Sequence, residues 1–192
     1  MKPEKFWDKQ AKDFITTPKY LNIDDTVLDY GCATGIISNA ISDKVKEIHA
    51  IDISSKMIEI AKTKAGERSI KNVNYAQATI FDGRYLKESF NVILAFRILH
   101  MLEDTQVVIR RINELLKPGG IFILVTACMG PLKVFLGVPL FLLRKIGIMP
   151  LHINMFNLPE LQGIITGGSF KIVEYERMND RLPHYCIVAR KL

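Results

Sequence analysis

The chemically most informative stretch of the chain is VLDYGCATG, over positions 27–35. An apolar run reaches Asp29 and then breaks into a turn built from Gly31, Cys32, Ala33 and Gly35. Residues with small side chains let a ligand approach the backbone closely, and a helix that starts after such a turn presents its first N–H groups to the ligand. The order strand, tight turn, helix therefore predicts a nucleotide-type binding turn.

Two acids stand beside this turn. Asp52 comes 17 residues after Gly35, at the end of the next apolar run. There it can accept hydrogen bonds from the two hydroxyls of a ribose, or it can cap the helix that follows. Asp29 directly precedes the turn and can either brace the loop or face a positively charged part of the ligand. Both alternatives remain open for Asp29.

The glycine spacing limits the choice of ligand. The turn is Gly31-x-Ala33-x-Gly35, whereas nicotinamide-binding proteins use GxGxxG, with the third glycine three residues after the second. The pattern therefore disfavours a nicotinamide-dependent oxidoreductase.

Apolar runs and amphipathic segments alternate along the chain and position these residues. Expected strands are 26–30, 47–52, 73–76, 90–95, 121–125, 170–176 and 185–190, and the last two are expected to pair as a hairpin. Expected helices are 35–42, one after Ser54 or Ser55, 103–116 and 159–167, with the helix 103–116 ended by Pro118-Gly119-Gly120. This alternation is typical of an α/β protein with a mostly parallel sheet and right-handed crossovers.

Composition is that of an ordinary globular protein. The 192 residues favour a single domain over 1–192, with an amphipathic helix at about 3–14. A net charge of +6 is compatible with an anionic partner, but the basic residues do not cluster. Three scattered cysteines indicate reduced thiols, and the charged N-terminus lacks the apolar core of a signal peptide, so we expect a cytoplasmic protein.

One segment departs from the alternation. Residues 115–159 contain no Asp or Glu, and an apolar and basic cap is expected at about 130–157. Its apolar run is shorter than the roughly 20 residues that cross a bilayer as a helix. The segment is a core or lid element, a cover for a hydrophobic substrate, or, through residues 131–150, a peripheral membrane or lipid contact.

Taken together, VLDYGCATG, AIDISSKMIEIAK, FNVILAFRILHML and KPGGIFILVT resemble the class I S-adenosylmethionine-dependent methyltransferases. The likeness is to their small-molecule branch, similar to the ubiquinone/menaquinone-biosynthesis type, and it covers residues 4–127 and LPELQGIITGGSFKIVEYE. It implies a Rossmann-like three-layer sandwich. The seven-stranded, mostly parallel sheet would have the order 3-2-1-4-5-7-6, with strand 7 antiparallel.

The resemblance also implies a cofactor site. S-adenosylmethionine would place its methionine part against the turn and its ribose on Asp52, and the product would be S-adenosylhomocysteine. Where the family often has Gly-Asp-Ala at the adenine, this chain has Ala78-Thr79-Ile80, so Thr79 or nearby Asp82 would replace the acid. The implied cofactor-binding residues are Asp29, Gly31, Cys32, Ala33, Gly35, Asp52, Ile53, Met57, Thr79, Ile80, Phe96 and Arg97.

Methyl transfer from a sulfonium needs positioning and exclusion of water, and a general base only when the acceptor must lose a proton. His100, shortly after the fourth strand, is the candidate base; packing beside the loop is its alternative role. Cys128 is expected to be structural, because the Pro-Cys of RNA cytosine methyltransferases is absent after the fourth strand. The four histidines are dispersed, so no metal site is expected.

The sequence thus predicts an S-adenosylmethionine-dependent methyltransferase acting by in-line displacement on a small molecule. The acceptor would be hydrophobic if the apolar segment covers it. An S-adenosylmethionine-binding module without transferase activity and an RNA methyltransferase are the alternatives, although no aromatic and basic platform for nucleic acid is present. Neither the acceptor nor the oligomeric state can be deduced from the motifs.

Overall fold

The computed structural model describes residues 18–128, 154–178 and 183–192. Its strands, in chain order, are β1 (Thr26–Tyr30), β2 (Glu47–Asp52), β3 (Val73–Gln77), β4 (Phe90–Phe96), β5 (Leu116–Ala127), β6 (Phe170–Arg177) and β7 (His184–Lys191). Its helices are α2 (Ile36–Ile41), α3 (Ser55–Glu67), α4 (Thr105–Leu115) and α6 (Leu158–Gly167). Short 3₁₀ turns are η1 (Pro18–Tyr20), η2 (Ser42–Lys44) and η3 (Leu99–Met101).

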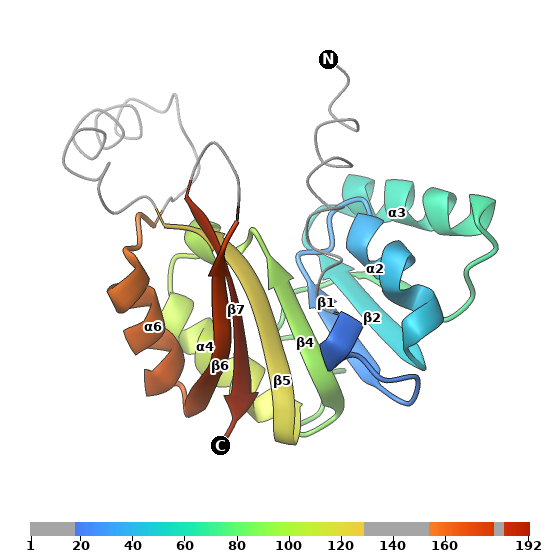
Figure 1. Ribbon diagram of the computed structural model, residues 1–192. Helices are drawn as coiled ribbons and strands as arrows, with labels where there is room; N and C mark the ends of the chain where they lie inside the picture. The colour runs from blue at the N-terminus through green and yellow to red at the C-terminus, as the bar shows by residue number, and fades with distance from the viewer. Residues whose placement is uncertain (1–17, 129–153, 179–182) are drawn as a thin grey trace, which may run out of the picture.

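Within these residues, seven strands form one sheet in the order β3-β2-β1-β4-β5-β7-β6 (Figure 1). Strands β1 to β5 pair in parallel, and β7 pairs antiparallel with both β5 and β6. The strand order and the antiparallel seventh strand predicted from the sequence are therefore confirmed. Parallel neighbours need crossover connections, which is why helices separate most of these strands along the chain.

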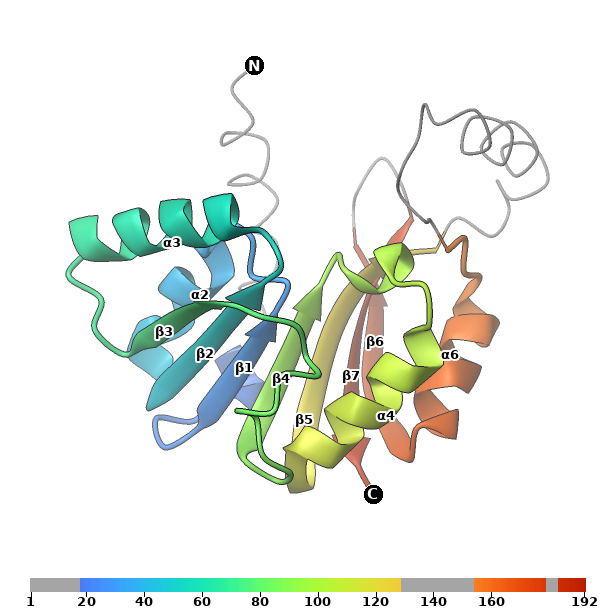
Figure 2. The ribbon, with the colours of Figure 1, turned by 180° about the vertical axis from the view of Figure 1, so that it is seen from behind.

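Two apolar clusters cover the two faces of the sheet (Figures 1 and 2). On one face, α2 and α3 contribute Ile41, Ile58, Ala61 and Ala65. On the other, α4 and α6 contribute Val108, Ile109, Ile112, Leu115, Leu161 and Ile165. The near-continuous apolar run of β4 follows from this three-layer arrangement, since a central strand is buried on both faces.

The start of β5 differs from the sequence-based expectation. Pro118-Gly119-Gly120 was expected to separate helix from strand, yet α4 ends at Leu115 and β5 begins at Leu116. The early part pairs with β4 through Leu116, and a register shift follows between Phe90 and Val92. Gly119, with φ 72°, supplies the conformation that this irregular part of the strand needs. Pairing with β4 overrides the local turn signal.

Some expectations lie outside the described residues. The N-terminal helix at 3–14 and positions 130–153 of the expected cap belong to this group, as do residues 131–150 with their expected lipid contact. In the part of the chain that the structure describes, no helix is long and apolar enough to cross a membrane.

Candidate functional site

The turn after β1 is held against β2 by its own backbone. Gly31 and Cys32 donate their N–H groups to the carbonyl oxygen of Ile51, at 2.8 and 3.0 Å. Gly31, Ala33 and Gly35 have positive φ angles of 79°, 46° and 72°. Such angles are common for glycine and rare for residues with a side chain. Alternating left-handed residues make the chain reverse directly from strand to helix.

Tertiary contacts explain why both ends of the turn are glycine. A Cβ atom on Gly31 would lie 2.5 Å from Cδ1 of Ile98, which follows β4. A Cβ on Gly35 would meet the hydroxyl of Tyr75, which donates to Oδ1 of Asn39 at 2.8 Å. The turn is therefore packed between β4 on one side and β3 on the other, and a larger residue at either end would displace a neighbour.

Asp52 joins the turn to the second βα connection. Its Oδ2 accepts the N–H of Ala33 at 3.0 Å, and its Oδ1 accepts the N–H of Ser54 at 2.9 Å. A carboxylate has about four acceptor sites, so each oxygen retains one after these bonds. Ser54, not Asp52, caps α3, because its side chain accepts the N–H of Met57. Asp52 is thus placed to hold two further donors beside the turn.

Asp29 lies beneath the turn. Its side chain is 2% exposed, and its Oδ2 accepts the hydroxyl of Ser38 on α2 at 2.5 Å. Burial raises the pKa of the Asp29 carboxyl to about 6, a net value in which the hydrogen bond from Ser38 opposes the rise and the nearby Asp52 carboxylate contributes to it. These contacts support the bracing role of the two alternatives left open by the sequence.

Cys32 points into the protein from the exposed turn. It is 8% exposed and packs with the cluster on the α2 and α3 face. Burial, with the acids Asp29 and Asp52 nearby, raises the pKa of its thiol far above the ordinary range, so the thiol stays protonated. Ala33, in contrast, is exposed at the tip, where its methyl group leaves the turn open.

Exposed apolar side chains follow the ends of β2 and β3. Ile53 is 72% exposed, Met57 38% and Phe81 52%. Since Asp52 pairs with Gln77, the segments that carry these residues leave the sheet at the same edge. Large exposed apolar side chains so near a polar turn favour contact with a flat apolar group of a ligand. The sequence-based reasoning included Ile53 and Met57 and missed Phe81.

The residues expected at the adenine are already hydrogen-bonded within the protein or buried in its core. The Thr79 hydroxyl accepts the N–H of Phe81 at 3.3 Å. Asp82 binds Arg84 through two bonds of 2.9 Å, which hold the pKa of its carboxyl down at about 2. Ile80 is fully buried in the core, so only its backbone can face a ligand. Thr79 and Asp82, the two expected substitutes for the family's acid, therefore both already accept hydrogen bonds from within the protein.

Arg111 and Gln77 hold this edge in place, and no motif pointed to either. Arg111, on α4, donates from Nη2 to the carbonyl of Tyr85 at 2.9 Å and from Nε to that of Ile80 at 3.3 Å. Gln77 donates from Nε2 to the carbonyl of Ile53 at 3.0 Å. Their partners are backbone carbonyls distant in sequence, which leave no mark in a residue pattern.

The end of β4 forms the other wall of the turn. Phe96 is its last residue, and Arg97 follows in a left-handed conformation with φ 58°. The Arg97 N–H donates to the carbonyl of Val125 at 2.6 Å, and the Arg97 Nη1 lies 2.9 Å from Nε2 of His184. The Arg97 guanidinium is therefore directed toward β7, while its neighbour Ile98 contacts the turn.

His100 lies in η3 beside the end of β5. Its Nδ1 is 3.4 Å from the Thr126 hydroxyl, and its carbonyl accepts the N–H of Asn154 at 2.7 Å. Burial, with smaller contributions from nearby His184 and Arg97, lowers the pKa of the imidazole to about 4. His100 is therefore a neutral imidazole at neutral pH.

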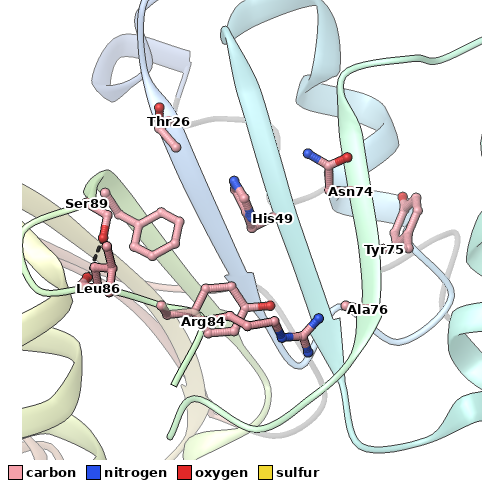
Figure 3. A pocket seen from close by; sticks show the side chains of 10 residues that line it. Thr26, His49, Asn74, Tyr75, Ala76, Arg84, Leu86 and Ser89 are labelled. Atoms are coloured by element: carbon pink, nitrogen blue, oxygen red, sulfur yellow. Dashed lines mark hydrogen bonds between the residues drawn. The ribbon is translucent and has the colours of Figure 1, made fainter. Parts of the chain in front are cut away.

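A separate hollow of about 460 Å³ lies between strands β1 to β3 and the β3–β4 connection (Figure 3). His49 and Asn74 point into it from neighbouring strands, and Arg84 and Leu86 border it. Thr26, at the start of β1, also lines it; the turn begins at Gly31, five residues later and about 17 Å along the strand. The hollow contains none of the residues predicted to bind the cofactor.

Solved structures share this fold. The YcgJ protein from Bacillus subtilis superposes with a TM-score of 0.79 at 18% identity, covering 95% of this chain and 98% of that one. A SAM-dependent methyltransferase from Methanosarcina mazei has a TM-score of 0.75 at 22% identity, covering 92% and 97%. At these identities the likeness establishes the fold, a Rossmann-like methyltransferase fold.

Curated relatives are more similar in sequence over part of their length. The uncharacterized methyltransferase YcgJ of Bacillus subtilis is 31% identical over 99 residues, which are 52% of this chain and 39% of the relative. A ubiquinone biosynthesis O-methyltransferase of Haemophilus ducreyi is 34% identical over 105 residues, 52% of this chain and 44% of the relative. The matches thus span less than half of these relatives.

A family model described as a methyltransferase domain matches residues 21–143. This range exceeds half of the 192 residues and contains the turn, Asp52 and the ends of β4 and β5. The chain therefore belongs to the methyltransferase domain family, as the resemblance of its motifs predicted.

Proposed function

We propose that this chain binds S-adenosylmethionine at the turn Gly31–Gly35 and transfers the methyl group to a small molecule, leaving S-adenosylhomocysteine. The observation that carries the proposal is the hydrogen bonding of the Asp52 carboxylate. Its two oxygens each hold one backbone N–H and each keep one acceptor site beside the turn. Two adjacent acceptor sites match a pair of neighbouring hydroxyls, as on a ribose.

The neighbouring residues fit the rest of such a ligand. Ile53, Met57 and Phe81 offer exposed apolar surface on the far side of Asp52, suited to the adenine ring. At the turn, the small Ala33 leaves access to the backbone for the methionine part. The left-handed Arg97 and the end of β4 border that part of the site.

When bound, the cofactor supplies a methyl group already activated on a sulfonium. The residues of this chain then have to orient the acceptor in line with that group and exclude water. His100 is our proposed general base for acceptors that must lose a proton. Its lowered pKa of about 4 keeps it neutral and able to accept a proton, but it holds the proton weakly.

A small-molecule acceptor is supported by the likeness to the ubiquinone biosynthesis O-methyltransferase and by the acid-free apolar segment over 131–150. The RNA alternative has less support. Cys128 is 4% exposed, and burial raises the pKa of its thiol to about 11. A thiol that stays protonated at neutral pH is a poor nucleophile, so Cys128 does not favour attack on a base.

The test is a calorimetric titration of the purified protein with S-adenosylmethionine, S-adenosylhomocysteine and NADH. We expect micromolar binding of the first two and none of NADH. A second measurement follows formation of S-adenosylhomocysteine in the presence of phenols, quinols and carboxylic acids. Absence of binding by both cofactor forms to folded protein would remove the basis of the proposal.

A further inference from the structure

The connection between β3 and β4, residues 78–89, crosses one face of the sheet without forming a helix (Figure 2). It starts directly after Gln77, the last residue of β3, which pairs with Asp52. The connection therefore begins beside the carboxylate that we propose as the ribose ligand. An irregular segment loses much conformational entropy when it is held in one conformation, so contacts from outside the segment have to offset that loss.

Two side chains within residues 79–88 are buried. Ile80 is fully buried and Tyr85 is 7% exposed, and both belong to the apolar cluster on the α4 and α6 face. Phe81, the residue after Ile80, is 52% exposed. An exposed aromatic ring next to a buried residue can move only as far as the backbone at the buried residue allows. The position of the Phe81 ring therefore depends on how firmly Ile80 is held.

Arg111 on α4 holds the connection at both of these buried residues. Its Nε donates to the carbonyl of Ile80 at 3.3 Å, and its Nη2 donates to the carbonyl of Tyr85 at 2.9 Å. Its Nη1 donates to the Glu114 carboxylate at 3.0 Å, and the Arg111 side chain is 17% exposed. Among the described residues, no other hydrogen bond joins residues 79–85 to another part of the chain.

The remaining hydrogen bonds of the segment are local. The N–H groups of Asp82 and Phe81 donate to the carbonyl and the hydroxyl of Thr79, and the Tyr85 N–H donates to the carbonyl of Asp82. These bonds shape two successive turns but do not fix them against the sheet. Loss of the Arg111 guanidinium would leave the carbonyl of fully buried Ile80 without a partner, which is costly. The segment would then shift to bring this carbonyl to water.

We propose that Arg111 is a positioning residue for S-adenosylmethionine: from α4 it holds residues 79–85 so that the exposed ring of Phe81 packs on the adenine. This inference rests on the proposed function, because it concerns the base end of the same ligand. Arg111 acts without touching the ligand, since its donors are directed to the two carbonyls and to Glu114. An aromatic ring that is already in place before binding loses less entropy when the ligand arrives.

The test is a double-mutant cycle on S-adenosylhomocysteine binding, measured by calorimetry. Its variants are Phe81→Ala, Arg111→Gln and the double variant. We expect each single variant to raise Kd by about tenfold, for loss of an ordered aromatic contact or of its support. The double variant should raise Kd by much less than the product of the two effects, because Arg111 acts through Phe81.

A second ligand distinguishes positioning from a general structural role. S-ribosylhomocysteine keeps the ribose and the amino-acid end but has no adenine. The wild-type protein and Arg111→Gln should bind it equally, since only the base contacts Phe81. Hydrogen exchange of the amides in residues 78–89 should also be faster in Arg111→Gln without ligand and should slow again on saturation with S-adenosylhomocysteine.

Two further variants guard the interpretation. Arg111→Lys keeps the charge and one donor group, so its Kd should fall between those of the wild type and Arg111→Gln; this variant carries the test if circular dichroism shows Arg111→Gln to be unfolded. Arg110→Gln removes an equal charge from the neighbouring exposed position on α4 and should change neither Kd nor exchange.

The outcomes separate this inference from the proposed function. Independent effects of the Phe81 and Arg111 variants, unchanged S-adenosylhomocysteine affinity in folded Arg111→Gln, or equal weakening of both ligands overturns the positioning role. Failure of S-adenosylhomocysteine to bind the wild-type protein counts instead against the proposed function, on which this inference rests.

Discussion

Replacement of Asp52 gives the most direct test of the cofactor site. Its Oδ2 accepts from Ala33 at 3.0 Å and its Oδ1 from Ser54 at 2.9 Å, so one acceptor site remains on each oxygen. Two ribose hydroxyls would fill both remaining sites. The carboxylate then acts twice, as a brace for the turn and as the ligand for the ribose.

The size of the effect follows from these bonds. A hydrogen bond to a charged group contributes about 1.5–3 kcal/mol, so losing two in Asp52→Ala should weaken binding by about 3–6 kcal/mol. This corresponds to an increase in Kd of roughly 10²- to 10⁴-fold. Asp52→Asn keeps one oxygen, but its amide NH₂ cannot accept from Ala33 or Ser54. We expect about 2–3 kcal/mol, or roughly 30- to 150-fold, for that variant.

Isothermal titration with S-adenosylhomocysteine measures these constants. The matched control is Asp43→Asn, which removes the same charge from an exposed residue in η2, before β2. It should change Kd by less than about twofold, because exposed charges at a distance are screened by salt. Circular dichroism confirms that each variant is folded. A folded Asp52→Ala protein that binds as tightly as the wild type would refute the ribose assignment.

Three further predictions concern stability and can be measured by urea unfolding. Gly35→Ala should destabilise the fold by about 1–3 kcal/mol, since φ is 72° and the new Cβ meets the Tyr75 hydroxyl, whereas Gly66→Ala, in an open part of α3, should stabilise it by about 0.5–1 kcal/mol. The carboxyl of Asp29 has its pKa raised from 3.8 to about 6, so the folded state holds its proton more tightly and the unfolding free energy should fall as pH rises from about 4 through 6. The unfolding free energy should fall by about 3 kcal/mol at most over this pH range, and this fall should be missing in Asp29→Asn. If Asp29→Asn shows the same pH dependence as the wild-type protein, burial of the Asp29 carboxyl is not its cause. The imidazole of His100 has its pKa lowered from 6.5 to about 4, so its contribution has the opposite sign: stability should decrease as pH falls from 6.5 toward 4, and His100→Gln should reduce that decrease.

Much of the fold was predictable because its signals are local. Strands β1 and β2 have the predicted bounds, 26–30 and 47–52, and the other strands agree to within a few residues, apart from the start of β5. Alternating apolar runs and helix-like segments are patterns over five to fifteen residues, set by side-chain periodicity. At β5, Pro118-Gly119-Gly120 is also a local signal, of a break, but hydrogen bonding to β4 decided against it.

The candidate site was predictable only where it follows the chain directly. The turn and Asp52 come at strand ends, and the parallel sheet places all such ends at one edge. Phe81 and Arg111 were missed because the first lies in an irregular connection and the second acts on the carbonyls of Ile80 and Tyr85. Backbone partners are the same for every residue type, so the sequence carries no sign of them.

The sequence by itself determined the glycine-containing turn after β1, the acid at the end of β2, the alternation of strands and helices, and through their combination the methyltransferase family. These features depend on backbone conformation and side-chain size within short segments. Only the tertiary structure decided that Asp29 is buried beneath the turn and that Arg97 meets His184. Burial and the pairing of antiparallel β7 with β5 depend on contacts between distant segments, and such contacts set the pKa values of the buried groups.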